Sequence, residues 1–236
     1  MSSIMYAGHD LGAYVTADLA EPVAHAVRVR TAEVPGRAGL LPVWGDVEPL
    51  RLSVNVWLDR GTMGARQLME ARRTLRAWLL SPAGGTLEVP GEPGLEWRDA
   101  VCAGVTTWSS LLSDGHARVE FDCLDPIAYG AARETTEATL EVGGTWETWP
   151  TYELVAAGGA GVSVTEGGVG VTVGRTLRAG DRVTIDCAAQ SCTVNGTDAL
   201  ADVGLGSDFP SLSPGRHYLQ FGGCASHVAR WRERWA

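Results

Sequence analysis

The sequence predicts a mainly β protein of two domains, with one α-helix in the first domain. Short runs of alternating apolar and polar residues recur along the chain, and turn-forming glycine is frequent, at 30 of 236 residues. Only one long segment repeats its apolar residues at helical spacing. Hydrophobic residues make up 45% and charged residues 20%, a balance typical of globular proteins, and the length fits two ordinary domains.

Two strands are expected before the helix. Residues 26–34 alternate apolar side chains with Arg28, Arg30 and Glu33, and the Pro-Gly-Arg-Ala-Gly segment at 35–39 then predicts a sharp turn or loop. Residues 50–58 place Leu or Val at every second position, which predicts a strand with one buried face.

A single helix is predicted over about 62–80. Its apolar side chains share one face: Ala65, Leu68, Ala71, Leu75, Trp78 and Leu79. Arginines occupy much of the remaining surface: Arg66, Arg72, Arg73 and Arg76. Ser81-Pro82 ends the helix, because proline cannot continue the hydrogen-bond ladder. We interpret the Arg-rich face as a solvated face or a subunit contact rather than a grip for nucleic acid.

A strand at 86–89 and a long hairpin complete the first domain. The hairpin strands are 97–109 and 116–124, and Ser113-Asp114-Gly115 supplies the turn between them.

This turn sets a register across the hairpin. It places Trp108 opposite Val119 and Thr106 opposite Phe121, on the core face with Cys123. The alternate side chains point the other way: Arg118, Glu120 and Asp122.

The composition changes near 131–135, and we expect a domain boundary there, with domains at 1–133 and 134–236. The segment 161–173 predicts a tight hairpin. A two-residue turn at Glu166-Gly167 sets Val164 opposite Val169 and Val162 opposite Val171. Further strands are expected at 182–187, 192–195, 217–221 and 226–235. About eight short strands joined by glycine turns predict a β-sandwich.

Charge and hydropathy narrow the function classes. The net charge is −9, so a phosphate-binding nucleic-acid reader is disfavoured. All 19 cations are arginine, which a GC-rich coding bias explains. The first residues show no signal peptide, and no apolar run is long enough for a membrane span. We therefore expect the chain to be cytoplasmic when made and to have no membrane partner.

The sequence predicts no catalytic, cofactor or metal site. Nucleophile-elbow, zinc-protease, phosphate-loop and calcium-loop motifs are absent, and His227 near Cys224 is an isolated pair rather than a zinc set. The five cysteines are expected to be reduced thiols, although Cys187 with Cys192, and Cys102 with Cys123, are spaced to approach across hairpins.

Aromatic residues of the second half are candidates for sugar binding. Trp146, Trp149 and Tyr152 are the candidate stacking residues, because aromatic faces suit the flat apolar surface of a sugar. Three more aromatics are weighed with them: Tyr218, Trp231 and Trp235. The alternative interpretation is ordinary core and interface packing, which we favour.

The order of short motifs resembles the distal tail proteins of siphophages. In the first half the similar segments are 4–12, the "PGRxG" loop at 34–39, the helix end and next strand at 76–87, and "F-x-C-x-D-P-x-x-Y" at 121–129. In the second half they are "GDxxxID" at 180–186, "VNG" at 194–196, "FPxLxPG" at 209–215 and the aromatic–basic strand at 231–235.

This resemblance implies a structural role. The first domain would be a tail-tube-like β-sandwich with a flanking helix, and the second a galectin-like or carbohydrate-module-like β-sandwich. Six copies would form a ring at the virion tail tip, between the tail tube protein and the tail-tip or baseplate hub protein. DNA would pass through the lumen without specific binding.

Three alternatives remain at this stage. The chain could be a host-adhesion protein that binds carbohydrate through its second domain. It could instead be a tail-tube or baseplate relative, or an enzyme that acts on the cell wall.

Overall fold

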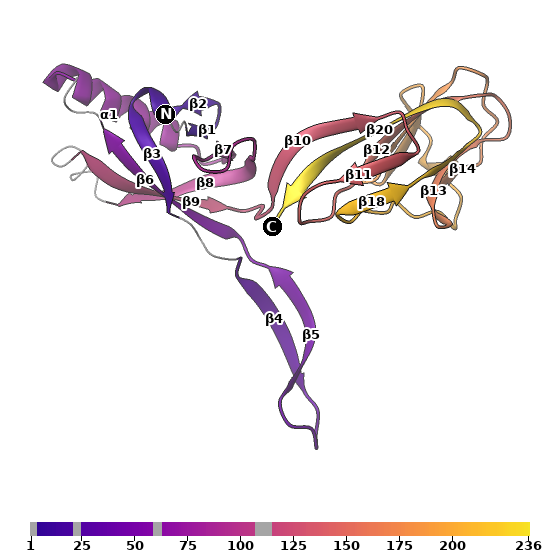
Figure 1. Ribbon diagram of the computed structural model, residues 1–236, viewed down its shortest axis with the longest axis horizontal. Helices are drawn as coiled ribbons and strands as arrows, with labels where there is room; N and C mark the ends of the chain where they lie inside the picture. Colours follow the sequence, from indigo (N-terminus) through magenta and orange to yellow (C-terminus); the bar gives the residue numbers. More distant parts are fainter. Residues whose placement is uncertain (1–3, 21–24, 59–62, 107–114) are drawn as a thin grey trace. The chain divides into compact units, whose positions relative to one another are not determined.

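The computed structural model describes residues 4–20, 25–58, 63–106 and 115–236 (Figure 1). They divide into two compact units, Met1–Tyr129 and Gly130–Trp235, with Ala236 grouped in the first. The division falls within strand β10 (Ala128–Thr135), four residues before the expected boundary at 133/134. Both units are built from antiparallel sheets, so the predicted mainly β fold is confirmed.

The first unit is a seven-stranded sheet in the order β2-β1-β7-β8-β9-β6-β3. Its strands are β1 (Met5–Tyr6), β2 (His9–Asp10), β3 (Val15–Ala20), β6 (Leu50–Leu58), β7 (Gly85–Glu88), β8 (Trp97–Thr106) and β9 (His116–Cys123), and a short 3-10 turn, η1 (Leu11–Ala13), precedes β3. The expected strand at 50–58 is confirmed, because β6 buries its alternate Leu and Val residues and pairs with both β3 and β9.

Helix α1 (Ala65–Leu79) covers one face of this sheet, and the predicted helix is confirmed. The first residue of the predicted helix, at position 62, lies outside the described part of the chain, and the helix begins at Ala65. The Gln67 side chain accepts a hydrogen bond from the Gly64 amide at 2.9 Å, which satisfies one donor at the helix start. Ala71, Leu75 and Leu79 are buried against the sheet, one helical turn apart.

The hairpin of β8 and β9 is confirmed, but its predicted register was wrong. Phe121 pairs with Cys102 instead of Thr106, and Val119 pairs with Val105. Trp108 and most of the predicted turn lie outside the described residues. The observed partners differ from the predicted ones by three residues at Val119 and by four at Phe121. The bulge between Cys102 and Gly104 accounts for one residue of this difference, and turn chemistry does not reveal such a bulge.

The second unit is a sandwich with its own buried core. One sheet has the order β10-β20-β12-β15-β16-β17, a second has the order β14-β13-β19, and β11 pairs with β18. The strands are β11 (Thr139–Val142), β12 (Thr151–Ala156), β13 (Val162–Glu166), β14 (Val169–Val173), β15 (Arg182–Asp186), β16 (Ser191–Val194), β17 (Thr197–Asp198), β18 (Gly215–Tyr218), β19 (Gln220–Gly222) and β20 (Cys224–Trp235). A 3-10 turn, η2 (Leu200–Asp202), follows β17.

The hairpin of β13 and β14 also differs from the predicted register. Val164 pairs with Val171, and Glu166 pairs with Val169, so the turn is Gly167-Gly168. Both turn residues have positive φ, 58° and 90°, as the hairpin turn that matches strand twist requires. The expected turn at Glu166-Gly167 would have needed a positive φ at a glutamate, which costs more than at a glycine.

Gly144 is required by the close approach of the last strand. Its φ is +98°, and a Cβ atom there would meet the Arg234 carbonyl. That carbonyl accepts hydrogen bonds from the Thr145 and Trp146 amides at 2.9 and 3.0 Å. The substitution Gly144→Ala is expected to cost about 3 kcal/mol or more, from backbone strain and the lost close approach.

The matched control for this prediction is Gly196→Ala. Gly196 also has a positive φ, +78°, but no atom lies within 4 Å of a Cβ there, so we expect a cost of about 1 kcal/mol from strain alone. Urea unfolding of both variants measures the difference. Equal losses of stability would contradict the close-approach argument.

Candidate assembly surfaces

A two-stranded arm extends the first unit outside its main sheet. Strands β4 (Val27–Glu33) and β5 (Leu40–Val47) pair with each other, and no other described strand pairs with them (Figure 1). Two hydrogen bonds hold the base of the arm in place. The Glu48 amide donates to the Ala26 carbonyl at 2.9 Å, and His25 Nε2 donates to the Pro126 carbonyl at 2.9 Å. The predicted strand at 26–34 is confirmed; β5 was not predicted.

One face of the arm is apolar. Alternation along β4 places Val27, Val29, Thr31 and Glu33 on the same face, and register partners share it. We call this surface the arm's apolar face: Val27, Val29, Leu40, Pro42 and Val47. Val27, Val29 and Leu40 are 60%, 50% and 56% exposed.

The opposite face of the arm carries charged side chains. Arg28 lies opposite Asp46, and the Arg28 Nε atom is 3.0 Å from Glu48 Oε1. The Arg30 guanidinium lies 5.7 Å from the centre of the Trp44 ring. This face also exposes Trp44 and Leu41, at 49% and 37%, but it holds most of the charged side chains of the arm. Within this chain nothing described covers the apolar face.

Such an arm is not expected to be stable by itself. An isolated two-stranded ribbon is marginally stable in water, and stability normally comes from burying one face. Contiguous exposed apolar side chains rimmed by polar ones are typical of protein interaction sites. The arm's apolar face is therefore the strongest candidate for an assembly contact.

A second candidate surface lies on the outer side of α1. Met69, Arg73 and Arg76 are spaced four and three residues apart, which aligns them along the exposed side of the helix. Met69 is 61% exposed, and Leu80, directly after the helix, is 74% exposed. We call these four residues the outer stripe of α1.

The outer stripe carries positive charge that is not neutralised locally. Arg66 Nε forms an ion pair with Glu70 Oε1 at 3.1 Å, one turn along the helix. Of the described acidic residues, none is within ion-pair distance of Arg73 or Arg76. The predicted Arg-rich face is thus exposed, and it mixes charge with apolar side chains.

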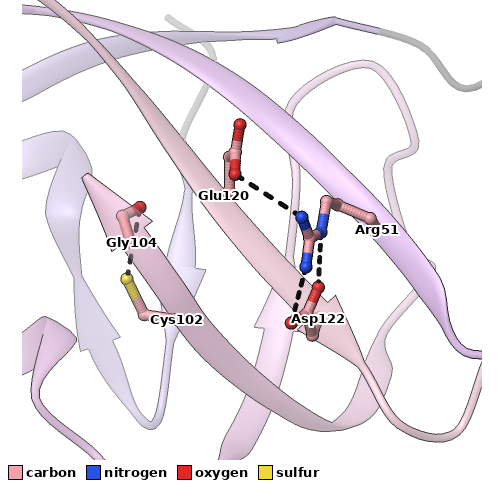
Figure 2. A network of polar contacts seen from close by, with 5 residues as sticks. All are labelled: Arg51, Cys102, Gly104, Glu120 and Asp122. Carbon is pink, nitrogen blue, oxygen red and sulfur yellow. Dashed lines mark hydrogen bonds and ion pairs between the residues drawn. The ribbon is translucent and has the colours of Figure 1, made fainter. Parts of the chain in front are cut away.

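The sheet face opposite α1 is polar and internally paired (Figure 2). The Arg51 guanidinium on β6 binds the Asp122 carboxylate on β9 through two hydrogen bonds, at 2.7 and 3.1 Å, and lies 3.9 Å from Glu120. The hydrogen bond to Asp122 raises the pKa of Arg51. Arg118, Glu120 and Asp122 therefore lie on the polar face, as predicted.

The bulge in β8 is visible beside this network. The Cys102 thiol donates a weak hydrogen bond to the Gly104 carbonyl at 3.9 Å (Figure 2), and burial raises the pKa of this thiol. All five cysteines are free, and Cys192 pairs with Ile185, so Cys187 and Cys192 are not opposite each other.

The predicted sugar-stacking residues do not form one open platform. Tyr152 is a core residue that is 2% exposed, and burial raises its pKa. Trp149 is half-buried, and the Arg234 guanidinium lies 5.0 Å from its ring centre. Trp146 is half-buried, and its amide donates to the Arg234 carbonyl. Tyr152 thus offers no face to a sugar.

One polar pair in this unit was not anticipated from the sequence. His217 Nδ1 is 2.8 Å from Glu166 Oε2, His217 Nε2 donates to the Ser213 carbonyl at 2.7 Å, and the Tyr218 amide donates to Glu166 Oε1 at 3.0 Å. The pair joins β18 to the end of β13. The predicted turn included Glu166, so the sequence did not indicate that this side chain pairs with His217.

Two further features were looked for among the described residues. These residues contain no group of three or more His, Cys, Asp or Glu side chains able to hold a metal ion. None of the helices among them is long and apolar enough to span a membrane.

The chain is similar to known phage tail proteins in sequence and in fold. Residues 143–235 match the siphovirus-type tail component family, in its C-terminal domain. The crystal structure of Dit from phage SPP1, described as a paradigm of the hub adsorption apparatus in phages infecting Gram-positive bacteria, is similar along the whole chain. The TM-score is 0.81 at 16% identity, and both chains are covered completely. The chain has a Dit-type fold.

The resemblance to siphophage distal tail proteins predicted from the sequence is thus confirmed. A chain of the phage P2 baseplate in its activated conformation with Ca is also similar, with a TM-score of 0.49 and 11% identity, over 98% of this chain and 97% of that one. The sequence matches no curated protein.

Proposed function

We propose that this Dit-type chain is a structural component of the phage tail tip that acts by assembly and not by catalysis. Six copies form a closed ring that joins the tail tube protein to the tail-tip or baseplate hub protein. The Dit-type fold and the tail component family of residues 143–235 support this proposal.

The observation that carries the proposal is the arm. Its exposed apolar face and its lack of a covering layer within the chain favour a partner surface. A closed ring supplies that surface through head-to-tail contacts, in which each copy offers one patch and receives another. Each arm is then covered by a neighbouring copy.

The charge of the chain is compatible with a DNA channel. The net charge of −9 favours repulsion of phosphates, so DNA passes through the lumen without being bound. On the polar sheet face, Asp122 and Glu120 already neutralise the Arg51 guanidinium.

The test is the size and symmetry of the purified protein. Negative-stain electron microscopy is expected to show six-fold rings with a central hole, and light scattering a mass near 150 kDa, six times the 25.0 kDa chain. Stacking into long tubes would favour a tail-tube protein instead. A 25 kDa monomer at high concentration, with or without purified tail partners, would contradict the ring.

A further inference from the structure

We infer that the arm's apolar face binds the outer stripe of α1 on the neighbouring copy of this chain. The inference rests on the proposed ring and specifies its contact. Both surfaces belong to the first unit, both expose large apolar side chains, and neither is covered by described residues of its own chain.

The two surfaces match in length. The outer stripe runs from Met69 to Leu80, about 17 Å along a helix. The apolar face runs from Val27 to Glu33, about 20 Å along a strand. A helix packed lengthwise on the two-stranded ribbon gives the arm the layer that it lacks, and Met69 can adapt its shape to the valines.

Their charges are also complementary. Glu33 is the only charged residue on the arm's apolar face, and it forms no ion pair with any described residue. Arg73 and Arg76 are the charged residues of the outer stripe. A carboxylate facing two guanidinium groups adds an attraction between the two surfaces and favours this contact over one between apolar side chains alone.

Other exposed surfaces fit the arm less well. The polar sheet face has charges that are already paired with each other, and an apolar ribbon would strip water from them without new hydrogen bonds. The exposed Leu200 and Leu205 of the second unit are close in sequence to Asp198 and Asp208, whose charges repel Glu33, whereas Asp202 beside them is already paired with Arg175.

The absence of lysine makes the contact directly measurable. The variant Arg73→Lys keeps the charge and introduces the only side-chain amine of the chain. In rings treated with a carbodiimide, we expect the amine at position 73 to couple to Glu33. In rings mixed from isotopically light and heavy chains, mass spectrometry should find this linkage between one light and one heavy peptide.

Arg66→Lys is the control for the coupling chemistry. Arg66 already pairs with Glu70 on its own helix, so the amine at position 66 should couple to Glu70 within one chain. Coupling at position 66, but none between position 73 and Glu33 in intact rings, overturns the arm–helix contact and leaves the proposed ring standing. Failure of the unmodified chain to form rings overturns both.

Charge reversal provides an independent measurement. Glu33→Arg and Arg73→Glu, each alone, place like charges together and are expected to reduce the ring fraction about tenfold. The two changes combined in one chain should restore most of it. No recovery in the combined variant, with both single variants folded, contradicts the pairing.

Discussion

Replacing Val27 and Val29 by aspartate is expected to leave a folded chain that no longer assembles. Both side chains are at least half exposed, so the isolated chain loses little packing when they are changed. In the ring they are covered, and each new carboxylate is buried without a partner, which costs several kcal/mol. We expect the dissociation constant of the ring contact to rise by about a hundredfold or more.

Light scattering across a concentration series measures this loss, and circular dichroism checks the fold. Val169→Asp is the matched control, because Val169 is 53% exposed but lies on β14 of the second unit. It should assemble normally. Normal rings from the Val27→Asp, Val29→Asp chain would show that the arm's apolar face stays in solvent.

Raising the pH from 8 to 10 is expected to destabilise the second unit by about 3 kcal/mol. Burial raises the pKa of Cys187 to about 12 and that of Cys192 to about 11, from an ordinary value of 9.0. At pH 10 the unfolded chain ionises both thiols while the folded unit keeps them protonated. Each thiol then favours the unfolded state by about 1.4 kcal/mol.

The sign of the effect defines the pH window. Below pH 9 both states hold the protons and stability is unaffected; the loss begins near pH 9 and continues until the folded pKa values are reached. In the first unit burial raises the pKa of Cys123 to about 12 and also raises that of Cys102, so this unit is expected to lose stability over the same pH range.

Urea unfolding in the presence of a reductant measures both losses. A chain with Cys187→Ala and Cys192→Ala should be less stable at pH 8 but should lose much less stability between pH 8 and 10. Tyr6 and Tyr152 also have pKa values raised by burial, but from a higher ordinary value of 10.0, so the range below pH 10 isolates the thiols. An unchanged pH dependence in the Cys variant would contradict the assignment.

Local patterns predicted the elements that are long and periodic. The alternation at 50–58 and the helical spacing of Ala71, Leu75 and Leu79 identified β6 and α1, because each buries one face against a single core. The proline at Ser81-Pro82 marked the end of α1 correctly. Ordered short motifs indicated the Dit-type fold, since turns and strand ends demand particular residues.

Only the tertiary structure showed which strand residues pair and which apolar side chains are buried. The observed register differs from the predicted one by three to four residues in the hairpin of β8 and β9 and by two in that of β13 and β14, because alternation within a strand does not show which residue of the next strand lies opposite. Strand β5 was missed because Pro42 argues against a strand interior, although an uncovered ribbon tolerates it. Tyr152 could be read as a surface aromatic until its strand was seen to face the core.

The sequence by itself therefore determined the fold class, the helix and the resemblance to distal tail proteins, because these depend on periodicity and turn chemistry within short segments. Only the tertiary structure decided which apolar residues stay uncovered, namely those of the arm and of the outer stripe of α1. The physical reason is that alternation shows which side chains share a face of a strand, whereas burial depends on what packs against that face.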